Sequence, residues 1–544
     1  MSKEKLPFVV TAGQMRAAEE AAVARGTTWA ALMEQAGAGV ADAVLRYAAP
    51  LANRQVLVLV GPGNNGGDAL VAARHLADTG ALVTLYVWRR SGVDANLQAC
   101  RERAIPELSA ATDGDGSLLA QALRKAVLVL DGFLGTGARP PTADLVTIIQ
   151  AVNAERAQRS DLRVVAIDLP SGVGADDGQV PTVAIRADLT VATGLIKRGL
   201  LLWPGRGYAG EIVVAPIGLS SLDGVLTMSE LLTASQARTL LPPRPADAHK
   251  GVFGKVLVVA GSINYPGAAV LACAGAQRSG AGLVTLATGR TVLSLATLPS
   301  EVTLLPVAEG DWGAIGPAAV DDLAEHLPGY QALLLGPGLG QAEATRKLVL
   351  RLFGLDHTRI RARVGFVAVG EPLTNQPQQT VALPPTVIDA DGLNILATAP
   401  DWFERLPPEH CVLTPHPGEM RRLLGVSELP ADRVATAAEA AQRWRQTVVL
   451  KGATTVIAAP DGRTLMYDGA NPALATAGSG DVLAGVIAGF IAQGCLPFAA
   501  AALGVYLHGA AGARARMAFG DAGVVAGDLL PLLPSVMQEL RTGG

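Results

Sequence analysis

Short apolar runs alternate with segments of helical pattern along most of the chain. In the first half these runs lie at residues 55–61, 82–88, 126–133, 163–172, 189–194 and 211–218. Runs that are apolar throughout are typical of parallel strands covered on both faces. The segments between them supply helices for those faces, and two earlier helices are expected at about 13–24 and 28–48. The pattern predicts an α/β domain built on a doubly wound, Rossmann-like sheet.

A second series of apolar runs follows a break that contains Pro242, Pro243 and Pro245. A chain of 544 residues is long enough for at least two domains. We therefore expect a first domain at residues 1–225, a linker at 226–245 and a second α/β domain at 246–544. Within the second domain, 354–383 is weakly patterned and is interpreted as an irregular insertion. The runs of this series lie at 254–262, 282–289, 301–307, 332–338, 386–394, 411–420 and 447–460, with helices expected at about 477–492 and 498–516.

Composition narrows the class of protein. Half of the residues are hydrophobic and 17% are charged, which suits a large core and argues against disorder. The formal net charge is -4 and no long basic block occurs, so nucleic acid is not expected as a partner. The four cysteines form no CxxC pair and no zinc spacing, which favours a reducing compartment. The N-terminus is too short and polar for a signal peptide, and the apolar stretch 481–494 is too short to span a bilayer. We expect a cytoplasmic protein without a membrane partner.

Three polar loops follow strands of the first half. They begin at Gly61 (GPGNNGGD), Asp131 (DGFLGTG) and Asp168 (DLPSG). In an open parallel sheet such loops share the carboxyl edge, where ligands bind. Glycines before a helix let backbone amides approach an anion, although the GxGxxG match alone is a weak signal because Arg89 and Arg90, not an acid, end the next strand. Each aspartate could be a helix cap, but together these oxygens suit an alkali or alkaline-earth cation better than zinc.

In this order and spacing, the three loops resemble the NAD(P)H-hydrate epimerase family over roughly residues 8–220. The resemblance implies a potassium ion bound by Asn65, Asp131 and Ser171. It also implies that Asp168 lies at the reacting C6 carbon and assists proton transfer. Lys197 resembles another recurrent position but could equally be a solvated surface lysine, and Ala69 stands where the family usually has glycine. The hydrated dinucleotide would contact Asp168 and two loop segments, namely Asn64, Asn65, Gly66, Gly67 and Asp68, and Gly135, Thr136, Gly137, Ala138, Arg139, Pro140 and Pro141.

The second half contains the sequence AGSGD at residues 477–481, directly before an apolar helix. Small residues at a helix start form an anion hole from backbone amides. Asp481, next to that hole, could accept a proton from a hydroxyl that attacks a terminal phosphate. The alternative is an ordinary aspartate in a first helical turn, stabilised by the helix dipole. GxGD with these flanking residues resembles the ribokinase-like fold, and the absence of GxxxxGK[ST] excludes a P-loop enzyme.

Further segments narrow the subgroup. They include HKG at 249–251, RSGAGLV at 278–284, GPGLG at 336–340, DADGLN at 389–394 and TPHPGE at 414–419. Together they resemble the ADP-dependent NAD(P)H-hydrate dehydratase family over roughly residues 240–535. A lone His416 would more often be a core or capping residue. The resemblance implies that the hydrate contacts Ala268, Gly338, His416 and Asp481, and that the nucleotide contacts Lys451, Gly452, Ala453, Thr454, Thr455, Gly478, Ser479 and Gly480.

The two resemblances imply one repair function for hydrated NADH and NADPH. The first domain would interconvert the R and S hydrates at C6 with K⁺ bound, and Asp168 would be its catalytic residue. The second would use Asp481, Mg²⁺ and ADP, the phosphoryl donor, to dehydrate the S form. The expected partners are these hydrates, ADP and further copies of the chain. Two alternatives stay open: a kinase for a small alcohol such as a vitamin precursor, with a dinucleotide-sensing front domain, and a non-catalytic binding module.

Overall fold

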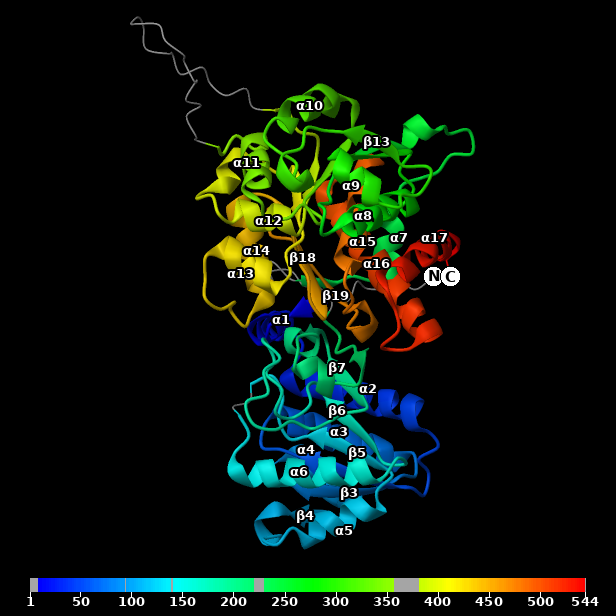
Figure 1. Ribbon diagram of the computed structural model, residues 1–544. Coiled ribbons are helices and arrows are strands. Elements are labelled where there is room, and N and C mark those ends of the chain that lie inside the picture. The colour runs from blue at the N-terminus through cyan, green and yellow to red at the C-terminus, as the bar shows by residue number, and fades with distance from the viewer. Residues whose placement is uncertain (1–7, 93, 138–139, 220–228, 357–380, 544) are drawn as a thin grey trace, which may run out of the picture. The chain divides into compact units, whose positions relative to one another are not determined.

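The computed structural model describes residues 8–92, 94–137, 140–219, 229–356 and 381–543, and it divides the chain into two compact units at Leu231 and Leu232 (Figure 1). Part of the expected linker 226–245 is folded, because β10 (Ser229–Leu231) and α7 (Ala234–Leu240) lie within it. Most of the weakly patterned stretch 354–383 lies outside the described residues.

The first unit is built on a parallel sheet with the order β4-β3-β2-β5-β6-β7-β9. Every neighbouring pair in this sheet is parallel. The order reverses between β2 and β5, which is the point where open α/β sheets bind ligands. The predicted Rossmann-like sheet is thus confirmed. Its strands are β2 (Gln55–Val60), β3 (Leu82–Val87), β4 (Glu107–Ser109), β5 (Leu128–Gly132), β6 (Arg163–Ile167), β7 (Leu189–Thr193) and β9 (Glu211–Ala215).

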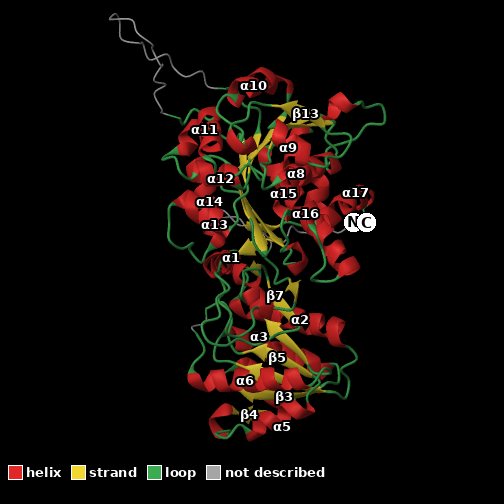
Figure 2. Cartoon of the chain, in the orientation of Figure 1, coloured by secondary structure: helices red, strands yellow, loops and turns green. Residues whose placement is uncertain are grey.

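Strand β2 shows why these runs are apolar throughout. Its residues Val56, Val58 and Val60 pack in one core with helices α2, α3 and α4. Leu57 and Leu59 point to the other face and pack with α5 and α6. Figure 2 shows these helices around the strands. Both faces of the strand are buried, so both sets of alternating residues must be apolar. The helices are α1 (Ala12–Ala24), α2 (Trp29–Ala48), α3 (Asn64–Asp78), α4 (Ala95–Glu102), α5 (Ser117–Lys125) and α6 (Ala143–Gln158).

Three short strands of the first unit lie outside the large sheet and were not predicted. Strand β1 (Phe8–Val10) pairs antiparallel with β10 and parallel with β8 (Ile196–Lys197). Two or three residues are too few to show a hydrophobic period, so sequence patterning cannot reveal such strands. Strand β8 matters because Lys197 is its last residue.

The second unit has a sheet whose strands run in the order β13-β12-β11-β14-β15-β16-β17-β18-β19. The pairs from β13 to β17 are parallel, and β18 and β19 are added antiparallel. The run at 447–460, expected as one strand, is a hairpin of β17 and β18. The strands are β11 (Lys255–Val259), β12 (Leu283–Thr288), β13 (Thr303–Pro306), β14 (Ala332–Leu335), β15 (Thr386–Ile388), β16 (Cys411–Leu413), β17 (Thr447–Leu450), β18 (Thr454–Ala458) and β19 (Thr464–Asp468).

Helices α8, α15, α16 and α17 supply much of the core of the second unit. Helix α15 (Ser479–Ala492) is buried along its whole length after Asp481, which explains why that stretch of sequence is apolar all round. No helix of the described residues is long and apolar enough to cross a bilayer. The other helices of this unit are α8 (Pro266–Arg278), α9 (Arg290–Leu295), α10 (Ala319–His326), α11 (Glu343–Leu352), α12 (Asp391–Leu396), α13 (Pro417–Leu424), α14 (Arg433–Trp444), α16 (Pro497–Phe519) and α17 (Ala526–Thr542).

Candidate active sites

The three motif loops of the first unit meet at the carboxyl edge of its sheet. The Gly61 amide donates to the Gly132 carbonyl at 3.2 Å, which joins the ends of β2 and β5. The Asn65 side chain donates to the Leu134 carbonyl at 2.9 Å, and the Leu134 amide donates to Ser171 Oγ at 2.9 Å. The loops after β2, β5 and β6 therefore form one connected site, as the sequence predicts for loops that share a sheet edge.

Asn65, Asp131 and Ser171 come together in the interior of this site. All three are buried, and Asp131 is 0% exposed. Ser171 donates to Asp131 twice, from its hydroxyl at 2.7 Å and from its amide at 2.8 Å. Burial raises the pKa of Asp131 to about 6, although the bonds from Ser171 and Phe133 oppose the rise. The Asn65 side chain is oriented by the bond to Leu134, and its buried Oδ1 has no hydrogen-bond partner in the described part of the chain.

Asp168 follows β6 and makes an ion pair with Lys197. The Lys197 ammonium lies 2.5 Å from Asp168 Oδ1, and the Thr193 hydroxyl donates to the same oxygen at 3.0 Å. Lys197 is 1% exposed, so the alternative of a solvated surface lysine is wrong. Its ammonium also donates to the Thr193 carbonyl at 2.6 Å. The charged pair is thus fixed by three segments: the loop after β6, which carries Asp168, the end of β7, which carries Thr193, and β8, which carries Lys197.

Two further carboxyl groups of the first unit face this pair. Burial raises the pKa of Asp68 well above its usual value, and the negative charges of Asp168 and Glu19 raise it further. Burial also raises the pKa of Glu19, against the opposing charge of Lys197. Asp68 lies in the first turns of α3 and Glu19 in α1. Three acids from distant segments therefore surround one lysine.

The glycine loop itself is held from below by Arg90. This side chain donates to the carbonyls of Gly61 and Gly63 at 2.8 and 2.9 Å and pairs with Asp94. A side chain on Gly66 would lie 2.1 Å from the Gly61 carbonyl oxygen, so the turn has no room for a Cβ. Asn64 is exposed and Gly67 buried in the same first turn of α3.

The loop between β5 and α6 lies beside Asn65. A Cβ on Gly135 would be 3.2 Å from the Asn65 side chain. Thr136 and Gly137 follow in a turn, and Pro140 and Pro141 come before α6. Of the residues expected to contact the hydrate, Ala138 and Arg139 lie outside the described residues.

In the second unit, Asp481 lies in the first turn of α15. The helix begins after Gly478, whose φ of +89° is left-handed, and no side chain of the described residues caps this end. The Ser479 amide makes only a long bond of 3.4 Å to the Thr476 carbonyl. The Ser479 hydroxyl donates instead to the carbonyls of Leu474 and Thr476. His508 holds the turn through a contact of 2.9 Å with the Ser479 carbonyl, and burial lowers its pKa to about 4. A neutral His508 donates this bond, so the turn keeps its amides for an anion.

Lys451 and Asp389 form the charged centre beside Asp481. The Lys451 ammonium lies 2.8 Å from Asp389 Oδ1, and the Thr414 hydroxyl donates to the same oxygen at 2.7 Å. A Cβ on Gly480 would lie 3.6 Å from the Lys451 ammonium and 3.9 Å from Asp389 Oδ2, which brings this pair to the helix start. Burial and the charge of Asp389 raise the pKa of Asp481 to about 7, against the opposing charge of Lys451.

His416 and Glu419 form the neighbouring side of this centre. His416 caps α13, where its Nδ1 accepts from the Gly418 amide at 2.9 Å, and its own amide donates to Glu419 at 2.8 Å. Burial raises the pKa of Glu419 to about 7, and Lys451, 4.0 Å away, opposes the rise. Burial lowers the pKa of His416, and the charge of Lys451 lowers it further. Half of the His416 side chain is exposed, so the cap leaves one face for a ligand.

Ala268 and Gly338, two of the residues expected to face the hydrate, lie against each other. A Cβ on Gly338 would be 2.7 Å from the Ala268 Cβ, and Gly338 has a left-handed φ of +61°. The same loop reaches Asp391, which accepts from the Gly340 amide at 2.8 Å. Asp391 also raises the pKa of Asp481, so this loop lies near the helix start.

The remaining residues expected to contact the nucleotide lie in the hairpin after β17. Gly452 and Ala453 are exposed in the turn, and the Thr455 hydroxyl donates to the Gly452 carbonyl at 3.2 Å. Thr454 is buried in β18. The Lys451 side chain therefore points to the charged centre, while Gly452 and Ala453 are exposed to solvent.

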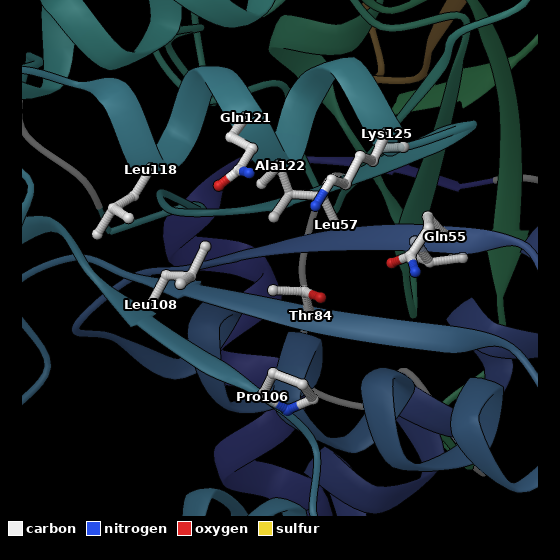
Figure 3. Close-up of a pocket in the computed structure, with 11 residues that line it drawn as sticks. Gln55, Leu57, Thr84, Pro106, Leu108, Leu118, Gln121, Ala122 and Lys125 are labelled. Atoms are coloured by element: carbon white, nitrogen blue, oxygen red, sulfur yellow. The ribbon is translucent and has the colours of Figure 1, made fainter.

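A separate hollow of about 270 Å³ lies in the first unit, between the sheet and α5 (Figure 3). Its lining includes Gln55, the first residue of β2, and Lys125, the last residue of α5. The motif loops leave the opposite, carboxyl end of β2. We therefore do not assign this hollow to the site.

Known proteins match both units. Residues 29–199 match the family described as YjeF-related protein N-terminus, and residues 256–534 match the family described as NAD(P)H-hydrate dehydratase. A bifunctional NAD(P)H-hydrate repair enzyme of Moorella thermoacetica is 40% identical over 525 residues, which cover 94% of this chain and 92% of that protein. The chain belongs to the family of bifunctional NAD(P)H-hydrate repair enzymes. Other members are those of Salinibacter ruber, 37% identical over 98% of this chain and 96% of that protein, and of Escherichia coli, 33% identical over 96% and 92%.

A solved structure of an ADP/ATP-dependent NAD(P)H-hydrate dehydratase from Bacillus subtilis, co-crystallised with ATP and Mg²⁺, is 31% identical. It covers 57% of this chain and 98% of its own, with a TM-score of 0.44. Membership of the repair enzyme family rests on the full-length relatives, which span both units.

Sequence reasoning did not assign a role to several charged residues of this family member. Asp389 is the first residue of the DADGLN segment and directly follows β15, so its position as an acid at a strand end could have marked it as a candidate site residue. Glu419 is likewise inside a quoted segment, three residues after His416. Glu19 lies on a helix with no motif, and nothing in its local sequence distinguishes it from Glu20.

Proposed function

We propose that the chain repairs hydrated NADH and NADPH in two steps, one in each unit. The first unit interconverts the R and S hydrates at C6, and the second dehydrates the S hydrate with ADP as phosphoryl donor. The observation that carries the proposal is the carboxyl group of Asp481 beside the uncapped amides of α15 and the Lys451–Asp389 pair. Family membership supports both activities.

In the dehydratase step, Asp481 accepts the proton of the C6 hydroxyl while that oxygen attacks the terminal phosphorus of ADP. The amides of Gly478, Ser479 and Gly480 bind the transferring phosphoryl group, because a helix start without a side-chain cap favours an anion. Lys451 adds a positive charge at the same place. Phosphate is a far better leaving group than hydroxide, so the electron pair of the ring nitrogen expels it from C6. Loss of a proton from C5 then forms the 5,6-double bond and restores the reduced ring.

The contacts around this centre suggest how the other residues share the two ligands. The turn of Lys451, Gly452, Ala453, Thr454 and Thr455 takes the nucleotide, since its exposed backbone leads directly from the ammonium that meets the phosphate. The hydrate lies against Ala268, Gly338 and the free face of His416. Asp481 then lies between the two ligands, where a general base is needed.

Mg²⁺ would be held in this site together with the nucleotide. In the part of the chain that the structure describes, no three His, Cys, Asp or Glu residues are grouped to hold a metal ion. Mg²⁺ commonly binds through substrate phosphates and only one or two carboxylates, and the acids around Lys451 can supply these. The ion would neutralise charge on the donor phosphates.

In the epimerase step, the hydrate lies over the connected loops, with Asn64–Asp68, residues 135–137 and residues 140–141 around it and C6 next to Asp168. A potassium ion would be held by Asn65, Asp131 and Ser171. The fit rests on the buried, unpartnered Oδ1 of Asn65 and on the purely oxygen character of the three side-chain ligands. A bound cation would stabilise the charged form of Asp131 and give the loops a fixed position under the substrate.

One assay tests the whole proposal. The R hydrate is incubated with the full chain, K⁺, Mg²⁺ and ADP, and the return of absorbance from the reduced nicotinamide ring is followed. We expect complete recovery with the wild-type chain, no recovery with Asp481→Asn, and recovery limited by slow epimer exchange with Asp168→Ala. A stable phosphorylated product would instead support the small-alcohol kinase. Cytoplasmic placement and self-association stay predictions from the sequence.

A further inference from the structure

Asp168 is held through one of its two carboxylate oxygens. The Lys197 ammonium and the Thr193 hydroxyl both contact Oδ1, at 2.5 and 3.0 Å. Both partners are buried. Among the described residues, none donates a hydrogen bond to Oδ2. This oxygen is also not one of the fully buried side-chain atoms that lack a partner, so a ligand can reach it. One oxygen is thus anchored in the protein, and the other is left to act on a ligand.

The backbone also fixes this position. Asp168 has a left-handed φ of +65°, which side-chain-bearing residues rarely adopt, and its amide donates to the Val191 carbonyl at 2.8 Å. Lys197 is held in turn by its bond to the Thr193 carbonyl at 2.6 Å. The carboxylate and the ammonium are therefore positioned by β7 and β8 and do not depend on a substrate for their contact.

The charges that face Asp168 come from three other elements. Lys197 is in β8, Asp68 in α3 and Glu19 in α1. Burial raises the pKa of both Asp68 and Glu19, so these two acids take up protons more readily than usual. Asp168 differs from them because it is in direct contact with the ammonium. Its Oδ1 is occupied by two donors, the ammonium and the Thr193 hydroxyl, so Oδ2 is the oxygen placed to accept a proton.

The Asp168–Lys197 ion pair restricts the chemistry at C6. The R and S hydrates can be exchanged by two routes that break different bonds. Expulsion of the C6 hydroxyl requires a group that donates a proton to it, and water then adds to the other face. Opening of the ring at the C6–N1 bond requires a group that accepts the hydroxyl proton. Asp168 with Lys197 on its Oδ1 suits the second requirement and not the first.

We propose that Lys197 is a positioning residue that anchors Asp168 by Oδ1 and leaves Oδ2 to accept the hydroxyl proton, and that epimerisation proceeds by ring opening with retention of the C6 oxygen. The inference rests on the proposed epimerase function of the first unit. It goes beyond that function because it states which bond breaks and which lysine decides it.

The step balances without a further reactant. Asp168 Oδ2 takes the hydroxyl proton, and the O–H electron pair forms the C=O bond of an aldehyde at C6. The C6–N1 bond breaks, its electrons pass to N1, and N1 receives the proton from Asp168. Rotation about C5–C6 presents the other face of the aldehyde to N1. Ring closure returns the proton through Asp168 to the oxygen, so C6 is inverted and the C6–O bond is never broken.

An oxygen label on the wild-type chain tests the route directly. The R hydrate is prepared with heavy oxygen at C6 and incubated in ordinary water with K⁺ and without nucleotide, so that dehydration is blocked. The S product is analysed by mass spectrometry at low conversion, with the uncatalysed exchange subtracted. We expect the label to be retained in the enzymatic product. Incorporation of solvent oxygen at each inversion would overturn the inference while leaving the epimerase function intact, whereas no acceleration of inversion would overturn both.

Variants of Lys197 test its role as the residue that positions Asp168. In Lys197→Met, the acid limb of the epimerisation rate should move to higher pH, because the positive charge beside the base is gone. Lys197→Arg keeps the charge and should restore most of the profile. Lys125→Met, at an exposed lysine on α5, is the matched control and should leave the profile unchanged. A Lys197→Met chain that is slower by the same factor at every pH would show a merely structural role and refute the assignment.

Discussion

The charge of Lys451 should set the pH at which the dehydratase begins to work. The pKa of Asp481 is raised from 3.8 to about 7, first by burial and then by Asp389, while Lys451 lowers it. A rise of roughly three units corresponds to about 4 kcal/mol against the charged form. A general base acts only when it is deprotonated, so dehydration should rise with pH through about 7 in the wild-type chain.

Replacing Lys451 by methionine removes the opposing charge and keeps the length of the side chain. Loss of an opposite charge within about 4–6 Å raises a carboxyl pKa by about 1–3 units, so that of Asp481 should move to about 8–10. At pH 7, the deprotonated fraction would fall from about one half to about one tenth for a shift of one unit, and to about one hundredth for two units. The rate should therefore fall roughly 5-fold to 50-fold at neutral pH and recover at alkaline pH.

The measurement is kcat/KM for the S hydrate across the pH range, with ADP saturating, so that epimerisation does not contribute. Lys255→Met, at an exposed lysine that begins β11 in the same unit, serves as the control and should follow the wild-type profile. A second loss, independent of pH, is expected from the missing charge on the phosphoryl group. If Lys451→Met lowers the rate but leaves the acid limb near pH 7, either Asp481 is not the base or Lys451 does not act on it.

Three further outcomes separate folding from binding. Gly480→Ala should leave the melting temperature unchanged, because the nearest atom to the new Cβ is 3.6 Å away, but it should raise KM for ADP, because the methyl group would crowd a bound phosphate. Gly478→Ala, at φ +89°, should lower the free energy of unfolding measured by chemical denaturation by about 1–3 kcal/mol. Withdrawal of K⁺ should slow epimerisation and spare dehydration, and Asn65→Leu should mimic it while Asn64→Ala keeps the K⁺ response. His416→Asn should keep the helix cap and the stability within about 0.5 kcal/mol, yet raise KM for the hydrate, as steady-state kinetics can show.

The large strands of both sheets were predictable because each is buried on two faces. The expected runs at 55–61, 82–88 and 189–194 agree with β2, β3 and β7 to within one residue at each end. The run at 447–460 was misread as one strand, because Lys451, Gly452 and Ala453 interrupt it without a proline or an NG turn. Strand β19 (Thr464–Asp468) was not expected, since it is short and only partly apolar.

The site was predictable where its residues stand in loops with an unusual local composition. GNNGGD, DLPSG and GSGD each combine glycine with a polar group at a helix start or strand end, so the sequence alone marks them. Lys197 and Asp389 could not be ranked in this way. Each is an ordinary charged residue in sequence, and its role arises from a partner 29 or 62 positions away. Only the packing of the sheet brings Lys197 to Asp168 and Lys451 to Asp389.

Both units place one lysine among several acids, but the lysine has a different partner in each. In the first unit Lys197 contacts the catalytic carboxylate itself, at 2.5 Å. In the second, Lys451 contacts Asp389 at 2.8 Å, and it acts on the catalytic Asp481 only through its charge. Direct contact anchors Asp168 by one oxygen and leaves the other to accept a proton, as ring opening requires. The indirect arrangement leaves Asp481 with a pKa of about 7, where it can take the hydroxyl proton during phosphoryl transfer and release it afterwards. The two lysines should therefore behave differently when they are replaced. Lys197→Met should disturb the anchoring of the catalytic carboxylate itself, whereas Lys451→Met should displace a titration of Asp481 that already lies near pH 7.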